Sequence, residues 1–309
     1  MKISLRFAGL TAMVFALWTP AAGAQTSSAP SQTATSQSSD AATRPATTTF
    51  FGDTGLWFVP TAEVLPNGKW SGSGYRRGTN YIQGFTNVGD IAGTFGVGVK
   101  DRAEIFGSFL FDTRIDRDLR PLFTNSSAVG GVVDRYPRAK SGWSGDSVGD
   151  LYLGVKVNLW SEYRQKPAAI GFRAIVKAPT GKKDVGASTG KADGAFDLIF
   201  SKDAGRRVEL SGYGGYEVRG KPDGFDTPSG AFRWGGGAGF PSRTPLRGVF
   251  EVNGVVPNSS TVTLTSALCT YDGSCAPGTS ATENLTRVTG GLTWQDRKGF
   301  FVGAGVSWN

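Results

Sequence analysis

The chain has 309 residues, with 33 Lys and Arg, 25 Asp and Glu, and no histidine. Without an imidazole that titrates near neutral pH, hydrolysis and acyl transfer that depend on histidine are excluded. We therefore expect no enzyme, no catalytic residues, no cofactor and no metal site. No segment approaches 18 uninterrupted apolar residues, so the sequence predicts no membrane-spanning helix.

Residues 1–24 have the features of a secretory signal peptide. Lys2 and Arg6 lie in front of the apolar run 7–18, and 22–24 form an A-x-A cleavage site. Removing these two cations leaves 31 basic against 25 acidic residues, a net charge of +6. A basic balance can indicate nucleic acid, but for an exported chain we expect anionic lipid or lipopolysaccharide headgroups as partners and no nucleic acid.

The next segment, residues 25–48, consists almost entirely of Ser, Thr, Ala, Gln and Pro. Such a composition buries too little apolar surface to offset the entropy of ordering, which predicts a disordered tether. The rest of the chain, 49–309, is predicted to form one β-barrel domain.

From Lys69 onward the sequence repeats one pattern, about ten alternating residues followed by a turn, with no sustained helical periodicity. In GDLYLGVKVNLW (149–160), Leu and Val occupy one parity and Asp, Tyr, Gly, Lys and Asn the other. Side chains alternate across a strand, so this stretch predicts a ribbon with one apolar and one polar face. Similar alternation marks 90–99, 102–111, 168–177, 194–201, 207–218, 230–240, 246–256, 283–294 and 299–308.

The connections between these stretches alternate between short and long. Short turns are expected at 100–101, 160–167, 203–206 and 241–245. Longer loops, rich in Gly, Ser and charge, are expected at 78–89, 113–147, 178–193 and 219–229. This alternation is typical of an outer-membrane barrel, with turns in the periplasm and loops outside. The predicted fold is all-β, a transmembrane antiparallel up-and-down β-barrel in the outer membrane of a Gram-negative bacterium.

The predicted number of strands follows from the positions of the two chain ends. Both chain ends of such barrels normally lie in the periplasm, which requires an even count. If 257–282 were a single outer loop, the last strand would finish outside the cell. A strand at 260–268 removes this conflict and gives about 12 strands, with 10 or 14 as alternatives. The cysteine loop is then expected on the periplasmic side.

The chain contains two cysteines, Cys269 and Cys275, six residues apart. In an oxidising compartment they are predicted to form a disulfide that closes a small loop. Two thiols without histidine are too few ligands for a zinc site.

The last strand carries a second kind of signal. Its apolar face ends in an aromatic residue, which resembles the C-terminal strand that directs outer-membrane proteins into the membrane. The departure from that pattern is Asn309, which follows the aromatic. We expect the outer-membrane insertion machinery and periplasmic chaperones as partners. The insertion-signal residues are Phe300, Val302, Val306 and Trp308.

Several phrases carry a family resemblance. GDLYLGVKV (149–157), IVKAPTGK (175–182) and STGKADGAFDLIFSKD (188–203) resemble the barrel family named for the meta-cleavage pathway of phenol degradation, and also OmpA-like barrel domains. The segment GDTGLWFVPTAEVLPNGKW (52–70) resembles the opening of exopolysaccharide-associated outer-membrane barrels. The resemblance implies passage of small molecules, hydrophobic ones among them.

The polar strand faces predict the interior of the barrel. The candidate lumen-lining residues are Glu104, Asp150, Lys156, Arg173, Lys177, Asp197, Arg207, Glu209, Arg233, Arg247 and Glu251. A barrel of intermediate size accommodates either a narrow polar pore or an ion-paired plug, and both alternatives stay open. The expected function is a passive channel or transporter for small solutes. The alternative is a non-conducting barrel, structural or associated with surface polysaccharide.

Overall fold

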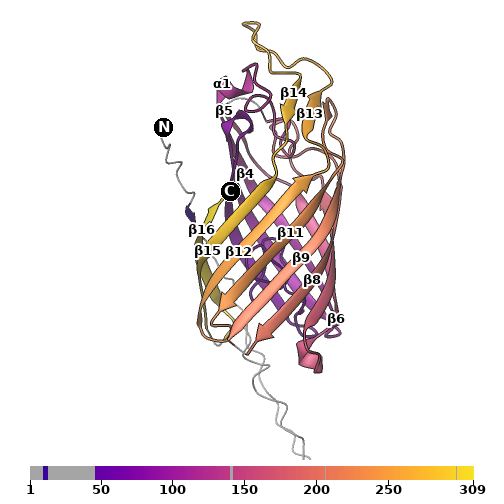
Figure 1. Cartoon of the computed structure of the whole chain (residues 1–309), viewed down its shortest axis with the longest axis vertical. Helices are drawn as coiled ribbons and strands as arrows, with labels where there is room; N and C mark the ends of the chain where they lie inside the picture. Colours follow the sequence, from indigo (N-terminus) through magenta and orange to yellow (C-terminus); the bar gives the residue numbers. More distant parts are fainter. Residues whose placement is uncertain (1–9, 13–45, 140–141, 206, 297) are drawn as a thin grey trace, which may run out of the picture.

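The main sheet of the protein curls into a nearly closed antiparallel barrel (Figure 1). A computed structural model describes residues 10–12, 46–139, 142–205, 207–296 and 298–309. Thirteen strands make up this sheet; two of them are short additions, and the other eleven form the wall. The wall strands are β2 (Trp70–Tyr81), β3 (Thr86–Val99), β4 (Ala103–Arg117), β6 (Leu151–Trp160), β7 (Ala169–Ala178), β8 (Asp193–Ala204), β9 (Val208–Arg219), β11 (Gly230–Phe240), β12 (Leu246–Pro257), β15 (Leu285–Gln295) and β16 (Phe301–Trp308).

The shorter elements lie at the margins of the wall. β1 (Leu10–Ala12) pairs with β16, and β5 (Gly142–Ser147) pairs with the last residues of β4, Thr113–Arg117. The others are β10 (Phe225–Asp226), β13 (Thr261–Leu264), β14 (Thr279–Ala281), α1 (Leu119–Leu122) and the 3-10 turns η2 (Gln83–Phe85) and η3 (Glu162–Arg164). In the described part of the chain, no helix is long and apolar enough to cross a membrane.

Each wall strand pairs with its neighbours in the sequence, which confirms the up-and-down antiparallel barrel. The described residues show no pairing between the edge strands β2 and β16, and β1 lies along the free side of β16. β1 falls within the predicted signal peptide. The rest of that prediction, and residues 25–45 of the predicted tether, lie outside the described residues.

The alternation in β6 has the predicted outcome. Leu153 and Val155 are 46% and 44% exposed on the outer face, whereas Lys156 is fully buried inside. The outer face elsewhere is equally apolar, with Phe172, Phe196, Phe232, Phe250 and Leu292 among its exposed residues. An exposed apolar band around a barrel is the surface that a lipid bilayer covers. The apolar faces of the strands therefore face lipid.

The two ends of the barrel differ in their connections. At one end, the short-turn end, the strands are joined by 100–102, 161–168, 205–207, 241–245 and 296–300. At the other, the long-loop end, the connections are 82–85, 118–150, 179–192, 220–229 and 258–284. The prediction of a long loop over 78–89 was wrong. β2 and β3 pair as far as Tyr81 and Thr86, so only residues 82–85 form the connection.

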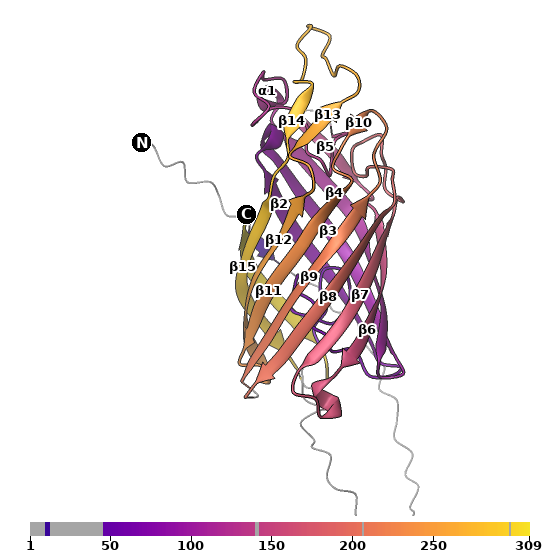
Figure 2. The ribbon, with the colours of Figure 1, turned by 45° about the vertical axis from the view of Figure 1, so that its right-hand side comes forward.

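The predicted wall strand at 260–268 was also wrong. β13 pairs with β10 and β14 in a separate three-stranded sheet at the long-loop end (Figure 2). Val262 is fully buried there, in a small apolar cluster with Leu122 and Val132. The cysteine loop, between β13 and β14, thus belongs to the long-loop end and not to the short-turn end. The wall has eleven long strands, and β16 runs toward the long-loop end.

The interior of the barrel is filled by the chain that precedes β2. Residues 46–65, here called the plug, are mostly buried and none of them is exposed. Phe50, Leu56, Trp57 and Val59 form an apolar cluster with wall residues such as Val249. Thr47 and Thr48, which the sequence assigned to the tether, are 2% and 1% exposed. The ordered domain therefore extends before residue 49.

Candidate functional site

Two inward glutamates bind the backbone of the plug. Glu251 on β12 accepts hydrogen bonds from the backbone N–H groups of Trp57 (3.0 Å), Phe58 (3.0 Å) and Val59 (2.8 Å). Glu104 on β4 accepts from the N–H and the hydroxyl of Thr54, each at 2.8 Å. The plug folds without a helix or sheet of its own, so these carboxylates satisfy donors that burial would otherwise leave unpaired.

A buried charge network joins the plug to the wall. Lys156 on β6 lies 3.4 Å from Asp53 and 3.3 Å from Glu104, and its Nζ donates to the carbonyl of Thr54. Arg173 on β7 lies 3.0 Å from Asp53 and 2.6 Å from Asp197. The side chains of all five residues that form these four ion pairs are fully buried. Each cation therefore has a carboxylate of the plug and a carboxylate of the wall.

Neutral polar groups complete the attachment of the plug around the barrel. The Ser201 hydroxyl accepts from the N–H of Ala62 at 2.8 Å, and the Ser211 hydroxyl donates to the Pro60 carbonyl at 2.6 Å. On the far side, Trp57 Nε1 donates to the Thr293 hydroxyl at 3.1 Å. The bonded wall residues lie on β8, β9 and β15, so the plug crosses the lumen.

Glycine permits the close approach of plug and wall at Gly52 and Gly305. Gly52 has a φ of +102°, and a Cβ there would lie 2.4 Å from the carbonyl oxygen of Gly107 on β4. A Cβ on Gly305 of β16 would lie 2.4 Å from the Trp57 ring. A side chain at either position would force the plug away from the wall.

The structure places ten of the eleven candidate lumen residues in the interior, where each is at most 7% exposed. Arg207 is the correction: it lies in the turn before β9 and is exposed, because the strand begins one residue later. Arg247 pairs with Glu209 at 2.5 Å and donates to the hydroxyl of Thr47. Most of the polar inner face thus contacts the plug or another wall residue.

Beyond the plug, toward the long-loop end, lies a cavity of about 170 Å³. Its lining includes plug residues Phe51 and Phe58, strand residues and the long loops. The aromatic residues are Phe51, Phe58, Tyr81, Tyr136, Tyr152 and Tyr213. The cations are Arg77, Arg135, Lys177, Arg219, Arg233 and Arg287, and the anions are Asp134, Asp150, Asp193 and Glu217. The cavity combines aromatic rings with an excess of positive charge.

Most of these cations are paired. Arg77 lies 2.5 Å from Asp90, Lys177 lies 2.7 Å from Asp193, and Arg219 lies 2.5 Å from Asp134. Arg135, on loop 118–150, lies 2.5 Å from Glu217. Burial alone would lower the pKa of the Arg135 guanidinium, but Glu217 and Tyr81 raise it above its usual value. These four cations therefore form ion pairs with the protein's own carboxylates.

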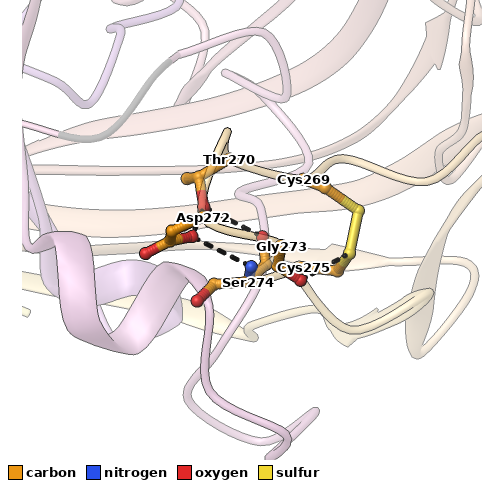
Figure 3. Close-up of a disulfide and its surroundings, with 6 residues drawn as sticks. All are labelled: Cys269, Thr270, Asp272, Gly273, Ser274 and Cys275. Atoms are coloured by element: carbon orange, nitrogen blue, oxygen red, sulfur yellow. Dashed lines mark hydrogen bonds between the residues drawn. A yellow bond between two sulfur atoms is a disulfide. The ribbon is translucent and has the colours of Figure 1, made fainter.

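The disulfide between Cys269 and Cys275 confirms the predicted pairing (Figure 3). Within its loop, the Asp272 carboxylate accepts from the N–H of Ser274 at 3.0 Å and from the Thr270 hydroxyl. The loop is exposed and lies outside the barrel wall. The disulfide therefore closes a surface loop and does not line the cavity.

The predicted insertion-signal residues share the outer face at β16. Phe300, Val306 and Trp308 are 41%, 42% and 75% exposed, and Val302 is half-buried. Their role in insertion stays a prediction. Within the described ranges, no group of three or more Cys, Asp or Glu side chains could hold a metal ion.

The sequence did not reveal the plug. Asp53 and Thr54 lie in a stretch without periodicity, so no pattern assigned them to the lumen. The sequence did contain one signal, which is the aromatic content of residues 46–65. Four of these residues are Phe or Trp, although the segment lacks the alternation of a wall strand.

The chain is similar to one described protein family and to a solved outer-membrane structure. The family model described as "putative MetA-pathway of phenol degradation" matches residues 71–232. The crystal structure of an outer membrane channel from Pseudomonas putida F1 aligns over 80% of this chain and 97% of that chain, with 14% sequence identity and a TM-score of 0.49. No curated protein sequence matches the chain.

Proposed function

Because the chain belongs to the family described as the putative MetA pathway of phenol degradation, we propose that it is a passive outer-membrane channel for small solutes. It acts without catalysis, and its gate is the plug. The observation that carries this proposal is the combination of a cavity at the long-loop end with a plug directly beneath it. A solute that enters the cavity passes on only when the plug moves.

The contacts of the plug suit a gate. Polar groups attach it to the wall, with the carboxylates of Glu251 and Glu104 as its main acceptors. When such a bond opens, water replaces the lost partner, so a hydrogen bond to a carboxylate contributes only about 1.5–3 kcal/mol and a neutral one about 0.5–1.5 kcal/mol. A lumen vacated by the plug is lined by charges and hydroxyls, which hydrate readily. Movement of the plug thus leaves a polar pathway.

A disulfide that locks the plug tests this mechanism. The Thr48 and Ser73 hydroxyl oxygens lie 2.7 Å apart, so Thr48→Cys with Ser73→Cys brings two thiols within bonding range. The lock is built in a Cys269→Ser, Cys275→Ser background, which removes interference from the native disulfide. In planar bilayers, we expect the oxidised double variant to conduct at least tenfold less than the same protein after reduction.

Single-cysteine variants of Thr48 and Ser73 are the matched controls, and their conductance should not respond to reductant. Deletion of residues 46–65 should give a permanently open barrel. A deleted barrel that folds, shifts with heat on gels and still passes no ions would contradict the channel. It would favour a structural barrel, including one associated with surface polysaccharide.

The orientation in the outer membrane is part of the proposal. We place the long-loop end outside the cell and the short-turn end in the periplasm, as in other barrels with this asymmetry. An epitope inserted after Asp223, an exposed residue of loop 220–229, should bind antibody on intact cells. An epitope after Gly205, in an exposed turn at the opposite end, should bind only after permeabilisation. The reverse result would invert the orientation.

A further inference from the structure

One row of residues on the inner wall borders the cavity. Asn253 on β12 lies directly opposite Arg287 on β15, and Gly235 on β11 lies opposite Asn253. Tyr213 on β9 continues the row as the partner of Gly235. Side chains at paired positions of adjacent strands point to the same face. Tyr213, Asn253 and Arg287 accordingly all line the cavity.

Arg287 differs from the other cavity cations. It is 5% exposed, yet no carboxylate among the described residues forms a salt bridge with it. Its guanidinium donates to the Thr79 hydroxyl and lies 5.0 Å from the centre of the Phe58 ring. Its Nε is buried without a hydrogen-bond partner in the described structure. A buried cation with an open donor is costly unless an anion joins it.

The neighbouring Asn253 has the same incomplete bonding. Its Nδ2 is buried and has no hydrogen-bond partner among the described residues. The two residues that carry these donors thus lie opposite each other on adjacent strands, and both residues line one cavity. Acceptors that bind two such donors together are the oxygens of a carboxylate or a similar oxyanion.

Aromatic rings border the two donors. Phe58 of the plug lies under the Arg287 guanidinium. The Tyr213 ring covers Gly235, where a Cβ would lie 2.5 Å from Tyr213 Cε1 and 3.0 Å from Asn253 Cβ. A flat apolar group held between these rings would present an attached carboxylate to Asn253 and Arg287. The site therefore combines an anion anchor with an apolar platform.

We propose that the cavity binds a small organic carboxylate with a flat apolar body, anchored by Arg287 and Asn253. This proposal names the class of solute that the channel would carry. Its biological use therefore rests on the proposed channel function. The site lies against the plug residue Phe58, so the bound solute contacts the gate itself. Binding would satisfy both open donors.

Equilibrium dialysis with the detergent-solubilised full barrel tests the site. Benzoate is the probe, benzyl alcohol shares its ring without the charge, and acetate shares its charge without the ring. We expect benzoate to bind at least tenfold more tightly than either. Arg287→Gln should weaken benzoate binding at least tenfold, and Asn253→Leu by several-fold. Arg287→Lys, which keeps the charge, should lose less than Arg287→Gln.

Arg120→Gln is the matched control, because this arginine is 91% exposed at the same end of the barrel. It should leave benzoate binding unchanged. Equal binding of benzoate and benzyl alcohol, or equal losses in the Arg120 and Arg287 variants, would overturn the proposal. Heat-shifted gel migration verifies that each variant folds. If Arg287→Gln does not fold, benzoate binding by Arg287→Lys and Asn253→Leu tests the site instead. Benzoate binding by a barrel that never conducts would sustain this site while refuting the channel.

Discussion

The plugged part of the lumen and the cavity beside it are built from the same alternating strands, yet their charges are satisfied differently. Around the plug, Lys156 and Arg173 each contact carboxylates from both the plug and the wall. In the cavity, Arg287 contacts the Thr79 hydroxyl, the Gly78 carbonyl and the Phe58 ring, and its Nε has no hydrogen-bond partner among the described residues. Paired charges fix the position of a protein segment, whereas an unpaired donor leaves room for a ligand. Mutations in the two regions should therefore have different consequences.

The largest effect is expected in the plug network. Arg173→Met keeps a long side chain but leaves Asp53 and Asp197 buried beside it without their guanidinium. Removing one partner of a buried ion pair typically costs about 3–5 kcal/mol of folding free energy. Urea unfolding in lipid vesicles should show this loss. Arg207→Met, in an exposed turn, should change the unfolding free energy by less than about 0.5 kcal/mol; similar losses in both variants would refute the distinction.

A smaller effect is expected when the plug loses one charged acceptor. Glu251→Gln keeps the shape of the side chain but removes the charge that three backbone N–H groups share. The expected cost is about 1–3 kcal/mol. In a Thr48→Cys variant, this cost should speed thiol labelling by roughly 5- to 140-fold, since 1.4 kcal/mol is a factor of ten. Unchanged labelling would show that Glu251 does not hold the plug.

The cavity should respond differently. Arg287→Gln removes a buried cation that has no carboxylate partner among the described residues, so the substitution leaves no buried carboxylate without its counter-charge. We expect a change in unfolding free energy below about 1.5 kcal/mol, which is the range of one lost hydrogen bond. The same urea experiment measures it. A loss comparable with that of Arg173→Met would make Arg287 a structural residue and remove the contrast between the regions.

The smallest effect on the barrel is expected from the disulfide, which belongs to neither region. Replacing Cys269 and Cys275 by Ser frees a short loop, whose closure is worth about 2–3 kcal/mol in the chain-entropy model. Because this loop lies outside the wall, barrel unfolding should stay within about 0.5 kcal/mol of the native protein. Limited proteolysis should cut the loop faster. Failure of the double Ser variant to form a folded barrel would mean that the loop guides assembly.

Strand alternation predicted most of the wall but not its full outline. β6 and its neighbours were recognised because lipid on one side and a polar interior on the other impose a strict period of two. The same period at Val262 and Leu264 was misleading. These residues pack against Leu122 and Val132 in the loops, and a small dry core selects the same alternation as a bilayer. The pattern alone does not distinguish the two environments.

The candidate site was predictable only in part. Alternation along β7 assigned Arg173 to the interior, and Arg287 lies on the polar face of β15 in the same way. It did not show that Arg173 binds Asp53, since the plug has no periodicity and its partners lie far away in the sequence. Nor did the alternation show that Arg173 forms salt bridges whereas Arg287 forms none among the described residues. That difference arises from the path of residues 46–65 through the lumen, which tertiary contacts determine.

The position of the plug at the start of the ordered chain has a consequence for assembly. Thr54 meets its partner Glu104 across a sequence separation of 50 residues, whereas Trp57 meets Glu251 across 194 and Thr293 across 236. Contacts between residues far apart in the sequence cost more loop-closure entropy than contacts between near ones. The bonds of Thr54 therefore need only the early wall strands, whereas those of Trp57 need the late ones. The last bonds of the plug form only when β12 and β15 join the sheet. A fully docked plug therefore requires a completed barrel wall.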